Sequence, residues 1–241
     1  MQNKLIQKAI EILKKGGIII YPTDTCYGIG VDATNKEAIK KLINLKGRNF
    51  GKSISIIVKN FKMANEIGKF NYQTKKLFKK YLPGPLTLVI KKKKSIYQLP
   101  NILTAGKKKI GIRMPDNKIA LELVKKFNKP ITATSANISN KSECYSMQEI
   151  LKQFKKNINP RIHFLACSSR YARSRSAAEI EKIDLILDTG KLLKIKPSTV
   201  VEVVGDKLKI LRQGPIKINP TQMIYYQAKR GKWKNLALLN L

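Results

Sequence analysis

Histidine is almost absent from this chain of 241 residues, in which His163 is the only one. Cysteine is also scarce, since the three cysteines are widely spaced and form no CxxC pair. These absences argue against a zinc site, a disulfide framework or a catalytic relay built on histidine. No apolar run is long enough to cross a bilayer, and the N-terminus lacks the apolar core of a signal peptide. We therefore expect a cytoplasmic protein with no membrane association.

Acidic residues are few as well, with 15 Asp and Glu against 49 Lys and Arg, for a net charge of +34. A field of this strength attracts polyanions such as nucleic acids. The chain is also rich in Lys, Ile and Asn together, a mixture that compositional drift in an A/T-rich genome produces, and both explanations remain open. The hydrophobic content of 43% is sufficient for a folded core.

Apolar periodicity predicts helices and strands that alternate along the chain. Helices are expected at residues 4–15, 36–45, 61–82 with a break near Gly68 and Asn71, 118–127 and 146–156. Strands are expected at 18–21, 54–58, 86–90, 110–114, 131–135 and 184–188, followed by a hairpin of 198–204 and 207–212. This order predicts an α/β fold, namely a twisted mixed open sheet, parallel and antiparallel, with helices packed on its faces.

The stretch 157–180 has no clear period and contains the basic segment SSRYARSRSAAE. We expect a basic loop or an added helical excursion there, and we interpret residues 157–181 as an insertion. The predicted organisation is one catalytic domain over residues 1–216, followed by a basic C-terminal tail over residues 217–241.

Polar side chains follow several of the expected strands, where ligands of open α/β sheets gather. Thr25 lies in the turn YPTDTCYGIG, and Ser135 and Asn137 lie in TATSAN. Each of them also suits an ordinary turn or a helix cap. Ser198 and Arg212 bound the late hairpin, where they also fit plain strand composition.

Two groups of cations suit anionic ligands. Lys46, Arg48 and Lys52 lie in the glycine-containing loop KGRNFGK, which fits a triphosphate or a solvated basic surface but is not a P-loop. Arg113 lies within the otherwise apolar strand IGIRM, where an unpaired charge would be costly. It pairs either with a core carboxylate or with the carboxylate of a ligand in a cleft, and we favour the cleft.

The order and spacing of these motifs carry more information than any one of them. PTDTxYG, KxR, LPGPLT, RMP, TSAN-S, STVVE and LRQGPI follow one another over residues 5–156 and 182–216. This series resembles the L-threonylcarbamoyladenylate synthases of the YrdC-like family. The resemblance implies a YrdC/DHBP-synthase-like fold with a deep basic cleft. It also implies the condensation of L-threonine, bicarbonate (or carbon dioxide) and ATP to threonylcarbamoyl-AMP and pyrophosphate. Partner proteins of a transferase complex would then modify an adenosine in tRNA.

The resemblance also assigns roles to residues. The four that match the signature of the active enzymes are Lys46, Arg48, Ser135 and Asn137. The positions expected to contact threonine are Thr25, Arg113 and Ser198, and those expected to contact ATP are Arg48, Lys52, Lys109, Ser135 and Arg212. Mg²⁺ is expected to accompany ATP, without a tightly bound metal site in the protein. Because the carbamate of threonine itself attacks the α-phosphate, no enzyme nucleophile is needed.

The chain departs from the family pattern at four positions. Asn49 and Ser53 replace prolines, Ile57 stands where a histidine is common, and Glu143 replaces a serine that contacts ATP. An alternative hypothesis is a non-catalytic RNA-binding or RNA-maturation factor that uses a basic concave face. A carbamoyl-adenylating domain of hydrogenase maturation is a third, opposed by the lack of CxxC zinc motifs and of extra domains.

Overall fold

The computed structural model describes residues 2–164, 182–204 and 207–218. Its helices are α1 (Gln2–Lys14), α2 (Lys36–Leu45), α3 (Phe61–Ile67), α4 (Tyr72–Tyr81), α5 (Lys118–Phe127) and α6 (Met147–Phe154), with 3-10 turns η1 (Asn101–Thr104) and η2 (Lys155–Asn157). Its strands are β1 (Ile19–Tyr21), β2 (Gly28–Gly30), β3 (Ser55–Ile57), β4 (Leu86–Lys91), β5 (Lys109–Arg113), β6 (Ile131–Ser135), β7 (Ile158–Phe164), β8 (Ile183–Ile186), β9 (Thr199–Val204) and β10 (Lys207–Arg212).

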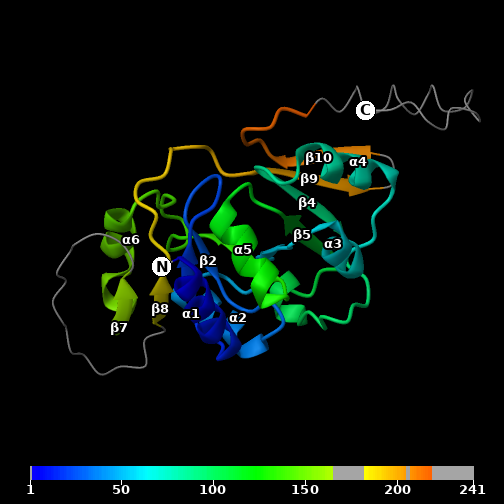
Figure 1. The fold of residues 1–241 in the computed structure, drawn as a ribbon. Coiled ribbons are helices and arrows are strands. Elements are labelled where there is room, and N and C mark those ends of the chain that lie inside the picture. Colours follow the sequence, from blue (N-terminus) through cyan, green and yellow to red (C-terminus); the bar gives the residue numbers. More distant parts are fainter. Residues whose placement is uncertain (1, 165–181, 205–206, 219–241) are drawn as a thin grey trace, which may run out of the picture.

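The strands form one mixed sheet in the order β10-β9-β4-β5-β3-β6-β2-β1-β8-β7 (Figure 1). Four neighbouring pairs are parallel, namely β4/β9, β3/β5, β1/β8 and β7/β8. The other five, β9/β10, β4/β5, β3/β6, β2/β6 and β1/β2, are antiparallel. The predicted twisted mixed sheet is therefore confirmed.

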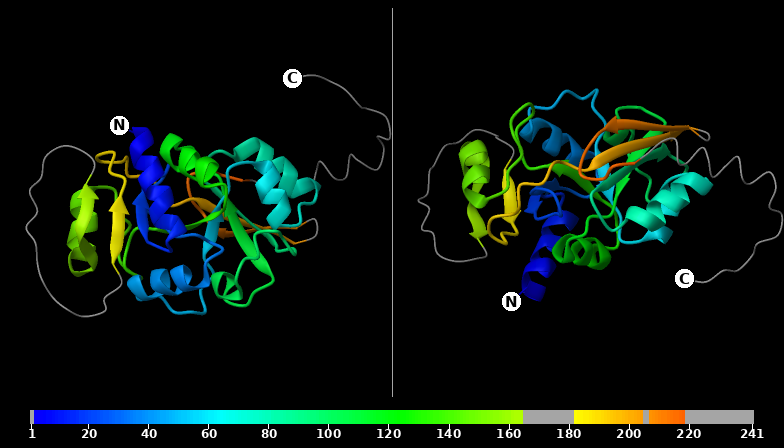
Figure 2. Two further views of the ribbon diagram at one scale, coloured as in Figure 1. Left: turned by 60° about the horizontal axis from the view of Figure 1, so that its bottom comes forward. Right: turned by 90° about the horizontal axis from the view of Figure 1, so that it is seen from above.

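Helices cover both faces of this sheet. Helices α1 and α5 pack against each other on one face, while α2 and η1 contact each other on the opposite face (Figure 2). The apolar side of α2 that the sequence predicts is fully buried, and the residues that form it are Ala38, Ile39, Leu42, Ile43 and Leu45. The core thus consists of two apolar layers, one on each side of the sheet.

The abundance of asparagine has a structural use at the helix starts. The side-chain oxygens of Asn35, Asn60, Asn71 and Asn117 accept backbone N–H groups at the starts of α2, α3, α4 and α5. Ser146 does the same for α6. These caps satisfy donors that the first turn of a helix leaves unpaired, which explains why the helices begin where they do.

Two strands differ from the sequence-based expectation. The polar turn after β1 contains β2, a three-residue strand with two glycines, and a Cβ on Gly28 or Gly30 would crowd the ring of Tyr21. The expected loop or helix at 157–180 begins instead with β7 (Ile158–Phe164), which pairs parallel to β8 at the sheet edge. Pro160 weakens the strand signal there, because proline is tolerated in strands mainly at edges. The segment RYARSR lies outside the described residues, as does nearly all of the predicted tail.

The register of four adjacent strands brings polar residues into one row. Arg212 of β10 lies opposite Val200 of β9, which lies opposite Thr87 of β4, which lies opposite Arg113 of β5. Residues that are directly opposite on neighbouring strands share one face of a sheet. Two arginines that are far apart in the sequence are thereby directed to the same side of the sheet.

In the ranges 2–164, 182–204 and 207–218, no helix is long and apolar enough to span a bilayer.

The loop after β10 is packed tightly against the start of β9. A Cβ on Gly214 would meet the carbonyl oxygen of Pro197 and the backbone nitrogen of Thr199 well inside contact distance. We expect Gly214→Ala to lower the free energy of unfolding by about 1–3 kcal/mol, as overpacking does. Urea denaturation measures this change. Gly51→Ala is the matched control, because its Cβ would meet nothing closer than 3.4 Å, and an equal loss in both variants would contradict the assignment.

Candidate active site

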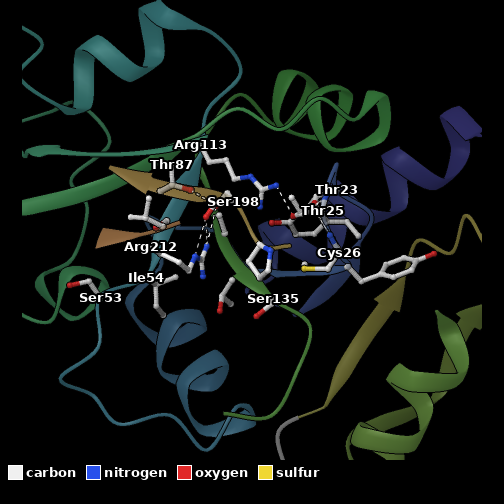
Figure 3. Close-up of a pocket in the computed structure, with 18 of the residues that line it drawn as sticks. Thr23, Thr25, Cys26, Ser53, Ile54, Thr87, Arg113, Ser135, Ser198 and Arg212 are labelled. Atoms are coloured by element: carbon white, nitrogen blue, oxygen red, sulfur yellow. Dashed lines mark hydrogen bonds between the residues drawn. The ribbon is translucent and has the colours of Figure 1, made fainter. Parts of the chain in front are cut away.

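A cavity of about 280 Å³ opens where the ends of several strands meet (Figure 3). Arg113, Ser135 and Arg212 are the last residues of β5, β6 and β10. The sequence-predicted site residues that line the cavity are Thr25, Arg48, Arg113, Ser135, Ser198 and Arg212. The structure thus brings these six residues, which come from distant motifs, together at one cavity.

Arg113 bridges two parts of the cavity wall. Its side chain is 11% exposed, and its Nη2 donates to the Asp24 carboxylate and, at 2.8 Å, to Thr25 Oγ1. Thr25 is held in turn by Thr23, whose Oγ1 lies 3.1 Å from Thr25 Oγ1 and donates to the carbonyl of Cys26. The two alternatives for Arg113 are therefore combined, because it pairs with a carboxylate and also lines the cavity.

Arg48 reaches the cavity from the loop after α2. Its Nη2 donates to the carbonyl of Ser53 at 2.7 Å, and its Nη1 lies 3.4 Å from Thr134 Oγ1. The Nε of Arg48 is buried and has no hydrogen-bond partner among the described residues. Burial lowers the pKa of this guanidinium below its usual value. Ser53 stands where the family has a proline. Its contact with Arg48 uses the backbone carbonyl, which proline also has, so the replacement keeps this hydrogen bond.

Arg212 closes the cavity from the side of the late hairpin. Its Nε and Nη2 donate to the carbonyl of Ser198 at 3.0 and 2.9 Å, and Ser198 Oγ lies 2.8 Å from Thr87 Oγ1. The pKa of Arg212 is lowered by partial burial and then by the positive charge of Arg113. Figure 3 shows Arg212 bound to Ser198, while Arg113 extends toward Thr25. The two guanidinium groups are close enough to repel each other, so an anion between them would be stabilised.

Lys46 lies beneath the cavity rather than in its lining. It is 2% exposed, and its Nζ donates to the carbonyls of Ser135 and Asn137 at 2.6 Å and to Asn137 Oδ1 at 3.0 Å. Ser135 Oγ also donates to Asn137 Oδ1 at 2.7 Å. Three members of the signature therefore form one network that fixes the end of β6, while Arg48 and Ser135 face the cavity.

Two predicted ATP contacts are not brought to the cavity lining. Lys52 is exposed in the loop before β3. Lys109 begins β5 and pairs with Glu202, about 13 Å along the strand from Arg113 at roughly 3.3 Å per residue. Of the departures from the family pattern, Ile57 is buried. Burial lowers the pKa values of Lys46 and Arg212, and the negative charge of Glu143 offsets a small part of that lowering.

Several lining residues were given no binding or catalytic role from the sequence. They include Tyr21, Thr23, Ser55, Thr87, Thr134 and Pro197. Thr87 lies within the quoted motif LPGPLT, and its place opposite Arg113 follows from strand register, which the sequence alone does not reveal. Thr134 lies in the motif TATSAN, directly before Ser135.

The cavity wall favours the binding of anions over covalent chemistry. Cys26 lines the cavity, but burial raises the pKa of its thiol to about 11, so the reactive thiolate is disfavoured. In the part of the chain that the structure describes, no group of three or more His, Cys, Asp or Glu residues could hold a metal ion. What remains is a set of guanidinium and hydroxyl groups, which suits phosphates and carboxylates.

The network around Lys46 predicts a dependence of stability on pH. Burial, and then the charge of Arg48, lowers the pKa of Lys46 to about 7. Because the folded-state pKa lies below the unfolded value, folding releases a proton above pH 7, and stability rises with pH up to the unfolded pKa near 10.4. The free energy of unfolding of the wild type should therefore increase relative to that of Lys46→Met, by up to about 1.4 kcal/mol per pH unit. Urea denaturation of both proteins between pH 7 and 10 measures this, and parallel curves would show that Lys46 stays protonated.

Comparisons with known proteins agree with this architecture. The Sua5/YciO/YrdC family model, described as "Telomere recombination", matches residues 11–172. A putative threonylcarbamoyl-AMP synthase of Methanocaldococcus jannaschii is 38% identical over 235 residues, which cover 90% of this chain and 96% of that protein.

Solved structures agree as well. The structure of Pyrococcus abyssi Sua5 complexed with L-threonine matches with a TM-score of 0.74 and 28% identity, covering 89% of this chain and 55% of that one. Escherichia coli YciO matches with a TM-score of 0.72 and 26% identity, covering 91% of this chain and 93% of that one. The chain thus spans about half of the Pyrococcus protein but nearly all of the other two. The predicted YrdC-like fold is confirmed, and the chain belongs to the Sua5/YciO/YrdC family.

Proposed function

We propose that this chain is an L-threonylcarbamoyladenylate synthase, which combines L-threonine, bicarbonate or carbon dioxide, and ATP. The observation that carries the proposal is the convergence of Arg48, Arg113 and Arg212 on one hydroxyl-lined cavity. The family relationship supports it, because a curated relative is named a putative threonylcarbamoyl-AMP synthase. The presence of L-threonine in the P. abyssi Sua5 structure supports this amino acid as a substrate.

The two ends of the cavity suit different substrates. Arg113, Thr25 and Ser198 offer a guanidinium and two hydroxyls, which match the carboxylate and the hydroxyl of threonine. Arg48 and Arg212, with Ser135, are suited to the phosphates of ATP. Lys52 is exposed in the adjoining loop, where its flexible side chain would add charge for the triphosphate. The contact between Lys109 and ATP remains a prediction from the resemblance alone.

In the proposed reaction the neutral amino group of threonine first attacks carbon dioxide and loses a proton, or attacks bicarbonate and releases water, to form a carbamate. A carbamate oxygen then attacks the α-phosphate of ATP, the bond to the β-phosphate breaks, and pyrophosphate leaves. The protein supplies no nucleophile, so its contribution is to align the carbamate with the α-phosphate and to neutralise charge on the leaving pyrophosphate. Arg48 and Arg212 are placed for the second task, and the Lys46 network holds Ser135 in position.

Mg²⁺ belongs to this proposal as a companion of ATP. Among the described residues, the cavity lining contains guanidinium and hydroxyl groups but no carboxylate, so its donor set fits phosphates better than a divalent cation. Mg²⁺ would therefore be bound chiefly by the phosphates and would stabilise the charge of pyrophosphate.

The product would serve tRNA modification. Threonylcarbamoyl-AMP is an activated mixed anhydride, and we propose that partner proteins transfer its threonylcarbamoyl group to an adenosine of tRNA. Contact of this chain with RNA stays a prediction, because the basic segments RYARSR and KRGKWK lie outside the described residues. A pure RNA-binding role is less favoured, since it does not require Lys46, Ser135 and Asn137 to form a buried network beside three arginines.

The activity has a direct test. Purified protein with ATP, Mg²⁺, L-threonine and bicarbonate should release pyrophosphate and form threonylcarbamoyl-AMP, identified by mass spectrometry. Omission of threonine or bicarbonate should reduce the release to background. Pyrophosphate release that is independent of threonine and bicarbonate, or no release at all, would overturn the proposed function.

Separate variants should affect the two substrates differently. Arg113→Lys keeps a cation beside Asp24 but loses the planar fork, so the KM for threonine should rise about tenfold or more while the KM for ATP changes little, because one or two charge-assisted hydrogen bonds are lost. Arg212→Lys should instead raise the KM for ATP. Steady-state kinetics measures both, and Lys40→Arg on α2, outside the cavity lining, is the control for the exchange of one cation for another. Equal effects of the two arginine variants on both substrates would contradict the assignment of the two ends.

A further inference from the structure

Asp24 is a buried carboxylate beside the cavity that has no role in the reaction proposed for this site. Its chain neighbours Thr23 and Thr25 both line the cavity. Its side chain is 9% exposed, and its Oδ1 accepts a hydrogen bond from Nη2 of Arg113. Its second oxygen, Oδ2, is buried and has no hydrogen-bond partner in the part of the chain that the structure describes. A buried carboxylate oxygen in this condition is rare in folded proteins, which favours a donor that arrives with a ligand.

Arg113, the ion-pair partner of Asp24, offers the complementary group, a hydrogen-bond donor. Nε of Arg113 is buried and also has no hydrogen-bond partner within residues 2–164, 182–204 and 207–218. One ion pair therefore holds an unused acceptor, Asp24 Oδ2, and an unused donor, Arg113 Nε, directly behind the part of the cavity wall that Thr25 and Arg113 form. An α-amino acid carries the two complementary groups, an ammonium donor and a carboxylate acceptor, on a single carbon atom.

The other cavity arginines are paired differently. Arg48 donates to a carbonyl and a hydroxyl, and Arg212 donates to the carbonyl and hydroxyl of Ser198. Among the described residues, Arg113 is the one cavity arginine in an ion pair with a carboxylate. The Arg113 end is therefore close to neutral, whereas the end with Arg48 and Arg212 is positive. A neutral pair favours a zwitterion, while the carboxylate of Asp24 disfavours a second phosphate or carboxylate there.

We propose that Asp24 is a specificity-determining residue that receives the α-amino group of the substrate on Oδ2 while Arg113 binds the carboxylate. The pair then selects an α-amino acid over a carboxylic acid of the same shape. This inference deepens the proposed function and rests on it for the identity of the amino acid as threonine. It also places the amino nitrogen, to which the carbamate carbon becomes attached, at a defined point of the cavity.

Binding measurements without ATP test this role directly. Isothermal titration compares L-threonine with (2S,3R)-2,3-dihydroxybutanoate, in which a hydroxyl replaces the amino group. The wild type should bind threonine at least about tenfold more tightly, the difference expected for one charge-assisted hydrogen bond. Asp24→Asn keeps the shape but removes the charge. It should weaken threonine about tenfold or more, and it should bind dihydroxybutanoate as tightly as the wild type or more tightly, because Arg113 loses its competing anion.

If Asp24 is only a counter-ion that positions Arg113, the two ligand affinities change in a different way. In that case Asp24→Asn changes the affinity for both ligands by the same factor, and this result would overturn the proposal. Asp32→Asn is the matched control, because Asp32 is also a buried carboxylate paired with a cation, Lys129, and lies beside Ile131 at the opposite end of β6 from Ser135. It should leave both affinities unchanged.

The wild-type comparison keeps the test valid if Asp24→Asn fails to fold. Equal affinity of the wild type for threonine and dihydroxybutanoate, or no binding of either, is sufficient to reject the proposal. The outcome is also separable from the proposed activity. A protein that discriminates between the two ligands but releases no pyrophosphate keeps this inference and loses the synthase assignment.

Discussion

Repulsion between like charges is the constraint around which the site is organised. Arg48, Arg113 and Arg212 line one cavity, and the charge of Arg113 contributes to the lowered pKa of Arg212. The protein holds these groups together with fixed oxygens, which are the carbonyls of Ser53 and Ser198 for two of them and the Asp24 carboxylate for the third. The positive charge that these oxygens do not neutralise attracts anions. A polyanion that binds between the arginines relieves their mutual repulsion, and its binding is favoured for that reason.

The fold supplies the rigidity that this arrangement requires. Strand register sets Arg113 and Arg212 in one row, and the buried amine of Lys46 ties the end of β6 to the end of α2. Backbone carbonyls and strand ends do not move independently of the core, so the lining groups hold their positions before any ligand binds. The proposed reaction uses no enzyme nucleophile, so it would depend on preorganisation of this kind.

Local signals in the sequence predicted most of the elements, and the reasons are physical. Helices 36–45 and 118–127 agree with the structure to the residue because an amphipathic period and an asparagine cap coincide there. Strand β2 was missed because three residues with two glycines carry no periodic signal, and β7 because proline masks an edge strand. For the site, the motifs located six of the lining residues. The burial of Lys46 beneath the floor and the pairing of Arg113 with Asp24, 89 residues away, depend on tertiary packing that no local pattern encodes.

We propose that one cavity holds an amino acid and a triphosphate side by side on different arginines. The decisive experiment is a crystal structure with L-threonine and α,β-methylene-ATP. We expect the threonine carboxylate within about 3 Å of the Arg113 guanidinium and the phosphates in contact with Arg48 and Arg212. Phosphates bound at Arg113, or threonine bound outside the cavity, would contradict it.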